Sequence, residues 1–194
     1  MTSIVFATNN PNKVSEIQAA VGDSIRIITL EAAGINVDIP EPHPTLEQNA
    51  MEKSRTIKGL SGFDCFSEDT GLEVDALNGE PGVLSARYAG DEKSPEKNID
   101  KLLYKLSTTE NRKARFRTVI SLIWEGSEHL FEGICEGEIV FERRGRNGFG
   151  YDAVFMPSGT KRTFAEMDMT EKNVISHRRK AADKLVGFFN NQLL

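Results

Sequence analysis

Two adjacent carboxylates, Glu68 and Asp69, stand between an apolar segment and the dipeptide Thr-Gly. Neighbouring negative charges repel one another unless a cation or hydrogen-bond donors compensate them. Mg²⁺ is a natural compensator because it prefers hard oxygen ligands and keeps several waters, and a carboxylate beside it can orient a water for attack. Glu41, in a proline-rich segment, is a further carboxylate for the same ion. The pattern predicts a metal-assisted hydrolytic centre at a strand end; the alternative is a plain acidic turn.

A polar segment at residues 8–13 reads Thr-Asn-Asn-Pro-Asn-Lys. Asn10 is a favourable N-cap and Pro11 a favourable first residue of a helix. A helix N-terminus offers N–H groups and a partial positive charge, to which Lys13 adds a full one. The segment therefore predicts a phosphate site, although it lacks the Gly-x4-Gly-Lys-Ser/Thr pattern of a P-loop. The alternative is a capped helix without a ligand.

An aromatic ring between two glycines occurs at residues 148–152, which read Gly-Phe-Gly-Tyr-Asp. Glycines let a flat ligand approach the backbone, and the ring of Phe149 can stack on that ligand. Asp152 can accept a hydrogen bond from a ring N–H. These features favour a base-binding loop, and the alternative is an aromatic loop packed on the core.

A basic stretch follows towards the C-terminus. Residues 143–184 contain ten Lys and Arg against five Asp and Glu, although the whole chain has a net charge of −5. At its centre are Lys172 and the run Ser-His-Arg-Arg-Lys at 176–180. Lys172 and Ser176 are four residues apart, so on one helix they would face one pocket. The cations could neutralise phosphate or bind a carbonyl oxygen, or they could form a solvated helix face.

Taken together, the four features supply what a nucleoside triphosphate needs. They are a phosphate-compatible helix start, a carboxylate pair suited to Mg²⁺, a base-stacking loop and a cationic segment. The acidic overall balance argues against a partner that is a nucleic acid polymer or an anionic membrane, but it leaves room for a local anion site.

The first half of the chain must place the phosphate segment and the carboxylates. An apolar run at 3–7, the polar turn and a helix from Pro11 form the opening of a β-α-β unit. A second strand is expected at 25–30, and alternating prolines at 36–45 favour an extended, stiff loop. Thr45 should cap a helix to about residue 58. A third strand at 63–67 should end at the carboxylates, with an extended run resuming at 72–76.

The second half predicts an antiparallel lobe. Residues 78–82 form a turn cluster, and Ser94 should open a helix. Two long extended runs at 114–124 and 129–141 predict a β-hairpin. After a Gly-rich loop at 144–150 come a short strand at 154–156, helix near 165, and a helix from about 175 to 190. With no linker or repeat, we expect one mixed α/β domain over residues 1–194, with two lobes.

Composition agrees with a folded globular protein, because hydrophobic residues make up 39% and charged residues 27% of the chain. Cys65 and Cys135 lie in apolar runs without nearby ligands at metal-binding spacing, so we expect buried structural thiols. No basic leader with a long apolar run precedes the first strand, and no apolar run approaches the roughly 20 residues that span a bilayer. A cytoplasmic location is therefore predicted.

The motifs resemble those of the inosine triphosphate pyrophosphatase family, whose members hydrolyse non-standard purine nucleoside triphosphates. Five segments match in the family's order, and together they are far more specific than any one alone. They are ATNNPNK at 7–13, SEDTGLEV at 67–74, GEPGVLSARYAG at 79–90, GFGYD at 148–152 and ISHR at 175–178.

The resemblance implies an elongated mixed β-sheet with two α/β lobes flanking a central substrate cleft, and a homodimer. It implies Mg²⁺-dependent cleavage of ITP, dITP and XTP to the nucleoside monophosphate and pyrophosphate, which would keep these nucleotides out of DNA and RNA.

It also implies roles for individual residues. Asp69 would be the general base, and the metal carboxylates would be Glu41, Glu68 and Asp69, with the division between base and ligand left open for the adjacent pair. The phosphate-binding set would be Thr8, Asn9, Asn10, Pro11, Asn12 and Lys13, with Lys53 and Thr70. The base-binding set would be Phe149, Gly150, Tyr151, Asp152, Lys172, His177 and Arg178.

Two departures from the family pattern occur. Many relatives have Glu-Asn-Ala after the proline-rich segment, where this chain has Gln-Asn-Ala at 48–50, with Glu47 one place earlier. Many bacterial relatives have Asp-Asp-Ser-Gly, where this chain has Glu-Asp-Thr-Gly at 68–71. The second change preserves the carboxyl and hydroxyl chemistry.

Purine selection would depend on the 6-position of the ring. Hypoxanthine and xanthine present a carbonyl acceptor there, to which Arg178 could donate, whereas adenine presents an amino donor. An unmet buried donor costs about 1–3 kcal/mol. Two rival functions stay open: a nucleotide-binding module without catalysis, and an enzyme that attacks the γ-phosphate.

Overall fold

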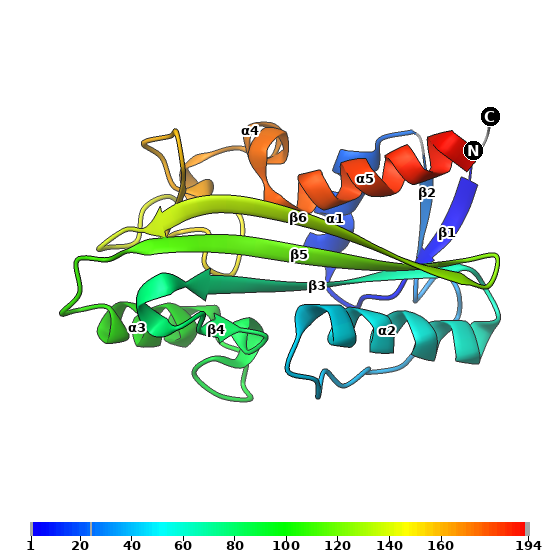
Figure 1. Ribbon diagram of the computed structural model, residues 1–194, viewed down its shortest axis with the longest axis horizontal. Coiled ribbons are helices and arrows are strands. Elements are labelled where there is room, and N and C mark those ends of the chain that lie inside the picture. The colour runs from blue at the N-terminus through cyan, green and yellow to red at the C-terminus, as the bar shows by residue number, and fades with distance from the viewer. Residues whose placement is uncertain (1, 24, 193–194) are drawn as a thin grey trace. The chain divides into compact units, whose positions relative to one another are not determined.

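The computed structural model describes residues 2–23 and 25–192 of the chain. Its strands are β1 (Thr2–Phe6), β2 (Ile25–Thr29), β3 (Cys65–Val74), β4 (Pro81–Gly82), β5 (Lys113–Trp124), β6 (Ser127–Ile139) and β7 (Phe155–Pro157). Its α-helices are α1 (Pro11–Val21), α2 (Leu46–Ser61), α3 (Pro95–Lys105), α4 (Met169–Ile175) and α5 (His177–Gln192) (Figure 1).

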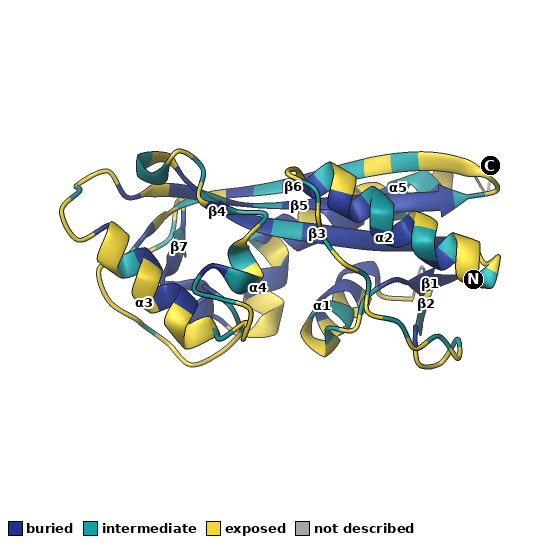
Figure 2. Ribbon diagram, turned by 90° about the horizontal axis from the view of Figure 1, so that it is seen from below, coloured by how far each residue is buried: buried dark blue, intermediate teal, exposed yellow. Residues whose placement is uncertain are grey.

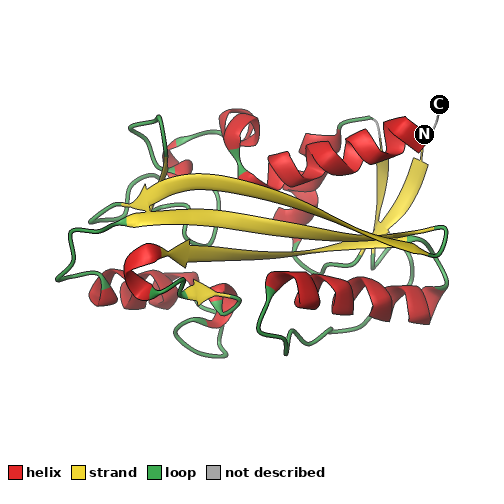
Figure 3. Ribbon diagram, viewed as in Figure 1, coloured by secondary structure: helices red, strands yellow, loops and turns green. Residues whose placement is uncertain are grey.

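The strands, yellow in Figure 3, form one mixed sheet. Their order is β2-β1-β3-β5-β6-β7, with β4 beside β3. Strand β1 is parallel to β2 and β3, whereas β4 is antiparallel to β3 and β7 is antiparallel to β6. The predicted mixed α/β class is therefore confirmed.

The chain divides into two compact units. The first comprises Met1–Asp69, Thr118–Gly133 and Arg178–Leu194, and the second comprises Thr70–Arg117 and Ile134–His177. Three strands, β3, β5 and β6, each continue from one unit into the other, because the unit boundaries fall within their residue ranges.

In the first unit, helices cover both faces of the parallel strands, with α1 and α5 on one face and α2 on the other. Phe6 of β1 and Phe66 of β3 stack with ring centroids 4.4 Å apart, in a buried cluster with residues of α1 and α5. Val5 and Cys65, their neighbours in sequence, belong instead to the cluster that contains Ile57 of α2. Consecutive side chains of a strand point to opposite faces, so adjacent residues of β3 meet different helices.

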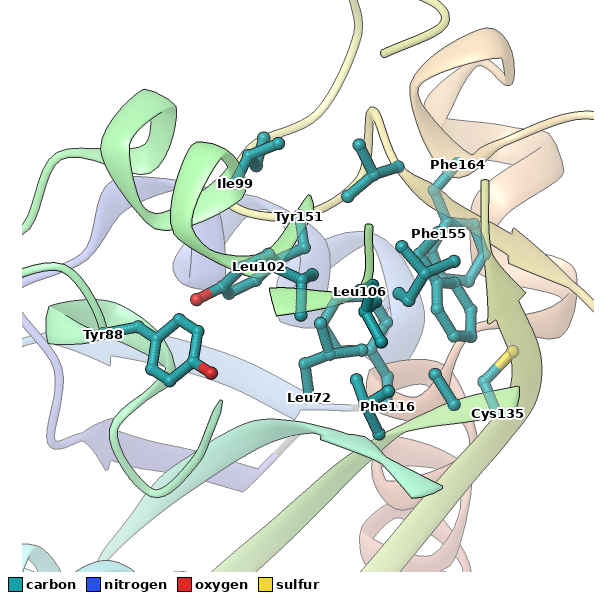
Figure 4. Close-up of a cluster of buried hydrophobic side chains, with 14 of the residues drawn as sticks. Leu72, Tyr88, Ile99, Leu102, Leu106, Phe116, Cys135, Tyr151, Phe155 and Phe164 are labelled. Carbon is teal, nitrogen blue, oxygen red and sulfur yellow. The ribbon is translucent and has the colours of Figure 1, made fainter. Parts of the chain in front are cut away.

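The second unit has its own core (Figure 4). Helix α3 contributes Ile99 and Leu102 from one face, as its apolar spacing predicts. The rings of Phe116 and Phe155 meet edge to face, with centroids 4.7 Å apart. Tyr151, from the Gly-rich loop, lies in the same cluster. This core supports the loop that was predicted to bind a base.

Strand β3 differs from its prediction. It runs without a break from Cys65 to Val74, so Glu68 and Asp69 lie in the middle of a strand and not at its end. Figure 2 shows that most of β3 is buried. The Thr-Gly pair predicts a turn, but Gly71 serves close packing: a Cβ there would lie 2.7 Å from the carbonyl oxygen of Gly82 on β4. The glycine thus permits a strand contact.

The C-terminal helix also differs. The sequence predicts one helix from about residue 175, but α4 ends at Ile175 and α5 begins at His177. Ser176 caps α4 with extended dihedral angles, φ −69° and ψ 154°, so it does not lie on a helix with Lys172 as predicted. Instead its N–H donates to the carbonyl oxygen of Lys172.

Other local predictions are confirmed. Asn10, Thr45 and Ser94 are the N-caps of α1, α2 and α3, and each side chain accepts a backbone hydrogen bond. Both cysteines are buried thiols. No helix of the described residues has both the length and the apolar character needed to cross a membrane.

Candidate active site

Strand β3 directs its two adjacent carboxylates to opposite faces of the sheet. On one face, Ser67 donates to the carbonyl oxygen of Ala50 in α2, and Asp69 accepts from Lys53 of the same helix. On the other face, Glu68 meets residues of α1 and α5. The strand period of two therefore gives each carboxylate its own cluster of charges.

The Glu68 carboxylate is the centre of a buried charge network. The Nε and Nη2 atoms of Arg178 donate to its two oxygens at 2.8 and 2.9 Å, and the Lys13 ammonium lies 3.1 Å away. Glu16 of α1 pairs with Nη1 of the same guanidinium. Burial alone would raise the pKa of Glu68, but the charges of Arg178 and Lys13 outweigh burial and lower that pKa to about 2. Glu68 is thus held ionised and compensated.

On the opposite face, the Lys53 ammonium lies between two carboxylates. It donates to Asp69 Oδ1 at 3.2 Å and also contacts Glu41 of the proline-rich segment. Burial alone would lower the pKa of Lys53, but the two carboxylates raise it. Burial also raises the pKa of Asp69, with Glu41 adding to the effect and Lys53 opposing it. Two carboxylates therefore share one buried cation.

This second cluster fits a further cation. Asp69 Oδ2 is buried and, among the described residues, has no hydrogen-bond donor. A buried carboxylate oxygen without a donor is costly unless something compensates it. The pair of Asp69 and Glu41 supplies hard oxygen ligands of the kind that Mg²⁺ prefers. The residues present thus fit the predicted metal.

The predicted set of three carboxylates around one ion is not gathered in the structure. Across residues 2–23 and 25–192, no group of three or more His, Cys, Asp or Glu side chains is placed to hold a metal. Glu41 and Asp69 meet at Lys53, while Glu68 lies on the other face with Arg178 and Lys13.

The segment 8–13 follows β1 and begins α1. Asn10 Oδ1 accepts from the N–H groups of Asn12 and Lys13, at 2.9 and 3.3 Å. Phe6 of β1 pairs with Phe66 of β3 in parallel register, so the residues that follow Phe6 and those that follow Phe66 continue in the same direction. This arrangement brings the start of α1 beside the carboxylates of β3 and explains how Lys13 reaches Glu68. The asparagine N-cap uses two of the N–H groups that a phosphate could have used.

In the second unit, the predicted base-binding residues form a compact group. Asp152 Oδ2 accepts from the N–H of Phe149 at 2.9 Å and from the Lys172 ammonium at 2.7 Å. That ammonium is 5.1 Å from the centroid of the Phe149 ring, a cation–π contact. Gly148 is required here, because a Cβ would lie 2.1 Å from Asp152 Oδ2. The Asp152 side chain therefore fixes the conformation of the loop by binding the backbone N–H of Phe149.

Two other predicted base-binding residues are packed in the core of this unit. Tyr151 is buried and donates its hydroxyl to the carbonyl oxygen of Ser85 at 2.9 Å. The His177 ring is also buried and stacks on Phe116, with centroids 4.6 Å apart. Gly150 adopts a positive φ of 60°, which lets the loop turn after the Phe149 ring. Thr70 is half-buried and follows Asp69 on β3.

Comparison with known proteins decides the family. The model of the Ham1 family matches residues 4–188. The chain belongs to the Ham1 family. It is 50% identical over 187 residues to the dITP/XTP pyrophosphatase of Christiangramia forsetii, covering 96% of this chain and 98% of that protein. The Ham1 protein of Staphylococcus aureus is similar in structure, with a TM-score of 0.89 and 38% identity, over 98% of this chain and all of that one.

A further relative in sequence is the dITP/XTP pyrophosphatase of Flavobacterium johnsoniae, which is 50% identical over 94% of this chain and 95% of that protein. The family resemblance that was predicted from five sequence motifs is therefore confirmed over nearly the whole chain.

Sequence reasoning missed several residues of this Ham1-family chain. Glu16 faces Arg178 from the same helix as Lys13, and its spacing three residues after Lys13 was an available signal. Asn98 of α3 is buried and holds the loop at 85–89 through three backbone hydrogen bonds. Asn49 of α2 is fully buried and bonds both backbone groups of His43. An asparagine among the apolar positions of an expected helix was the signal for the last two.

Proposed function

We propose that this chain hydrolyses non-standard purine nucleoside triphosphates, namely ITP, dITP and XTP, to the nucleoside monophosphate and pyrophosphate. The names of its relatives support the substrate class and the reaction. The observation that carries the proposal is Asp69, a buried carboxylate of raised pKa whose second oxygen has no donor among the described residues. Such a group can accept a proton from an attacking water.

The residues of the first unit would handle the phosphates. Lys13 and Lys53 would neutralise phosphate oxygens. The start of α1 and Thr70, which is the first residue of the second unit, would donate hydrogen bonds to them. Glu41 and Asp69 would hold Mg²⁺, which when bound would balance charge on the phosphate oxygens. Glu68 would act at a distance, by holding Arg178 and Lys13 through its buried ion pairs.

The chemical step would use Asp69 as the base. The water oxygen forms a bond to the α-phosphorus, the bond from that phosphorus to the bridging oxygen breaks, and the water proton passes to the carboxylate. Lys53 would keep the carboxylate oriented through its hydrogen bond to Oδ1. A pKa raised by burial brings a carboxylate closer to the operating pH, which improves it as a base.

The residues of the second unit would select the purine. The Phe149 ring would stack on the base, and the Lys172 ammonium beside that ring would donate to the 6-carbonyl oxygen. Arg178, the donor first expected there, is buried and bonded to Glu68 and Glu16. Lys172 is also buried and paired with Asp152, but its ammonium lies beside the Phe149 ring, so we assign Lys172 to the carbonyl and Arg178 to holding Glu68. Adenine would leave the Lys172 donor unmet, at a cost of about 1–3 kcal/mol.

Several finer predictions belong to the same proposal: dependence on Mg²⁺, a single domain over residues 1–194, a homodimer and a cytoplasmic location. A purine nucleoside triphosphate is the only proposed partner besides a second copy of the chain, with no nucleic acid polymer and no membrane.

A nucleotide panel with product analysis tests the function. The purified chain with Mg²⁺ is expected to convert ITP to IMP and pyrophosphate, and to leave ATP largely intact. Release of IDP and phosphate would support the rival that attacks the γ-phosphate. Binding of ITP without turnover would support the non-catalytic nucleotide-binding module.

A further inference from the structure

We infer that Asn49 is a positioning residue that fixes Glu41 by clamping the proline-rich segment at residues 35–45. The inference rests on the proposed function, in which Glu41 is a metal carboxylate, and it adds a residue to which no step of that reaction gave a role. It follows from the burial pattern of the segment, the two hydrogen bonds of Asn49 and the spacing along α2.

The burial of side chains along the segment alternates with a period of two. From Ile35 to His43 the odd-numbered residues are half-buried and the even-numbered residues are exposed. The half-buried aliphatic residues Ile35, Val37 and Ile39 pack against the core cluster of Val5, Leu30 and Ile57. Glu41 continues the same register, so its side chain points inwards like those of the aliphatic residues before it. The alternation sets the direction of the Glu41 side chain but does not by itself fix the position of its backbone.

Asn49 holds the segment two residues after Glu41. Its Oδ1 accepts from the His43 N–H at 2.9 Å, and its Nδ2 donates to the His43 carbonyl oxygen at 3.1 Å. The side-chain amide thereby satisfies both backbone groups of His43, as a neighbouring strand would. Asn49 itself is 0% exposed, so its amide has no water to replace a lost partner, and leaving it unpaired is costly.

The clamp and the charged contact share one face of α2. Asn49 and Lys53 are four residues apart and so lie one above the other on the helix. Lys53 contacts Glu41, while Asn49 contacts His43. Glu41 and His43, which are two residues apart on the segment, thus contact Lys53 and Asn49, which are one turn apart on the helix.

The prolines transmit the clamp to Glu41. Pro40, Pro42 and Pro44 alternate with Glu41 and His43. Proline fixes its own φ and restricts the residue before it, so the backbone from His43 back to Glu41 has few conformations. Fixing His43 therefore fixes Glu41. His43 also lies 3.6 Å from Glu52 of α2 through its Nε2. Another polar tie on this segment, from Asn9 Nδ2 to the Val37 carbonyl oxygen at 2.8 Å, comes from an exposed side chain and lies four residues before Glu41.

The test measures Mn²⁺ binding by electron paramagnetic resonance, which requires no nucleotide and no turnover. Asn49→Ala removes both hydrogen bonds, and we expect it to weaken Mn²⁺ binding about tenfold or more, as loss of an outer partner of a metal ligand does. The matched control is Ser54→Ala, another fully buried polar residue of α2, whose hydroxyl pairs with Ser121 and not with the segment. It should leave Mn²⁺ affinity unchanged.

The route through Glu41 has its own test. In the Glu41→Gln background, Asn49→Ala should weaken Mn²⁺ binding little further, because the group that it positions has already lost its charge. Hydrogen exchange adds a direct readout, since the His43 amide should be protected in the wild type and in Ser54→Ala but should exchange faster in Asn49→Ala.

A second pair of variants avoids the buried position. Pro42→Gly loosens the backbone between the clamp and Glu41, whereas Pro44→Gly loosens it on the other side of the clamp. Both prolines are exposed, so both variants should fold. We expect Pro42→Gly to weaken Mn²⁺ binding several-fold and Pro44→Gly to leave it near the wild-type value.

Three results would overturn the inference: equal losses of Mn²⁺ affinity in Asn49→Ala and Ser54→Ala, a full further loss for Asn49→Ala in the Glu41→Gln background, or equal effects of the two proline variants. Failure of the proposed function would look different, because a wild-type chain that does not hydrolyse ITP would leave the Mn²⁺ comparisons unaffected.

Discussion

At the scale of the residue, the most informative fact is that neighbours in sequence have different surroundings. Glu68 is compensated by Arg178 and Lys13, and its pKa falls to about 2. Asp69 shares Lys53 with Glu41, and burial raises its pKa. Both are buried carboxylates, so residue type alone does not predict their different surroundings. The alternation of side chains along β3 produces the difference. It gives Glu68 two compensating cations and leaves Asp69 with one oxygen that has no donor among the described residues.

This contrast predicts opposite effects for two isosteric substitutions. Asp69→Asn should lower kcat for ITP about a hundredfold or more, because the base is lost. Its melting temperature should stay close to that of the wild type, because Lys53 keeps its pairing with Glu41. Glu68→Gln leaves Arg178 and Lys13 with less compensation inside the protein. It should lower the free energy of unfolding by about 3–5 kcal/mol.

Steady-state kinetics and chemical denaturation on the two variants check this prediction. A stable Asp69→Asn variant with near wild-type turnover would contradict the assignment of the base. A Glu68→Gln variant as stable as the wild type would contradict the view that its ion pairs hold the first unit together.

At the scale of the element, β3 and β4 are in contact through glycine backbone. A Cβ at position 71 would lie 2.7 Å from the carbonyl oxygen of Gly82, and a backbone atom cannot move away as a flexible side chain can. Gly71→Ala should therefore destabilise the chain by about 1–3 kcal/mol. Gly59→Ala is the matched control, since Gly59 lies within α2 and a Cβ there meets nothing within 4 Å.

The control should be neutral or stabilising by about 0.5–1 kcal/mol, because alanine favours helix over glycine. Urea unfolding of both variants measures the difference. If Gly71→Ala were as stable as Gly59→Ala, the close approach of β4 to β3 would not be a constraint on the fold.

Most elements of this fold were predictable because their signals are local. An asparagine or a serine before a proline, followed by helical spacing, is enough to place α1 and α3. The same local logic failed at Glu68 and Gly71, where polar and turn-forming residues predict a strand end. Their places are fixed by helices on both faces and by β4, which are contacts between distant segments. Tertiary packing overrides propensity at such positions.

The site was predictable in composition and less so in arrangement. Of the charged residues in the two clusters, the five motifs contain Lys13, Glu68, Asp69 and Arg178, whereas Glu16, Glu41 and Lys53 lie outside them. The predicted helix through Lys172 and Ser176 failed because Ser176 is a helix C-cap, and no strong breaker such as proline or glycine marks it in sequence. Which residue pairs with which cation depended on strand alternation and helix placement.

At the scale of the whole molecule, each compact unit contains one buried cysteine: Cys65 lies in the first and Cys135 in the second. Burial raises the pKa of Cys65 to about 11, so at pH 8 only about one in a thousand of its thiols would be ionised, against about a quarter for a free cysteine. Neither thiol should react with a thiol reagent at pH 8 while the chain is folded.

The two thiols therefore report on the opening of the two units separately. Strands β3, β5 and β6 each have residues in both units. When one unit unfolds, each of these strands loses part of its length. We expect both cysteines to become reactive in a single urea transition with the same midpoint, as in a two-state domain. Pulse labelling followed by peptide mass spectrometry at each urea concentration measures both sites in one sample, with Cys65→Ser and Cys135→Ser as single-thiol controls. Two separate midpoints would show instead that the units unfold independently despite the strands they share.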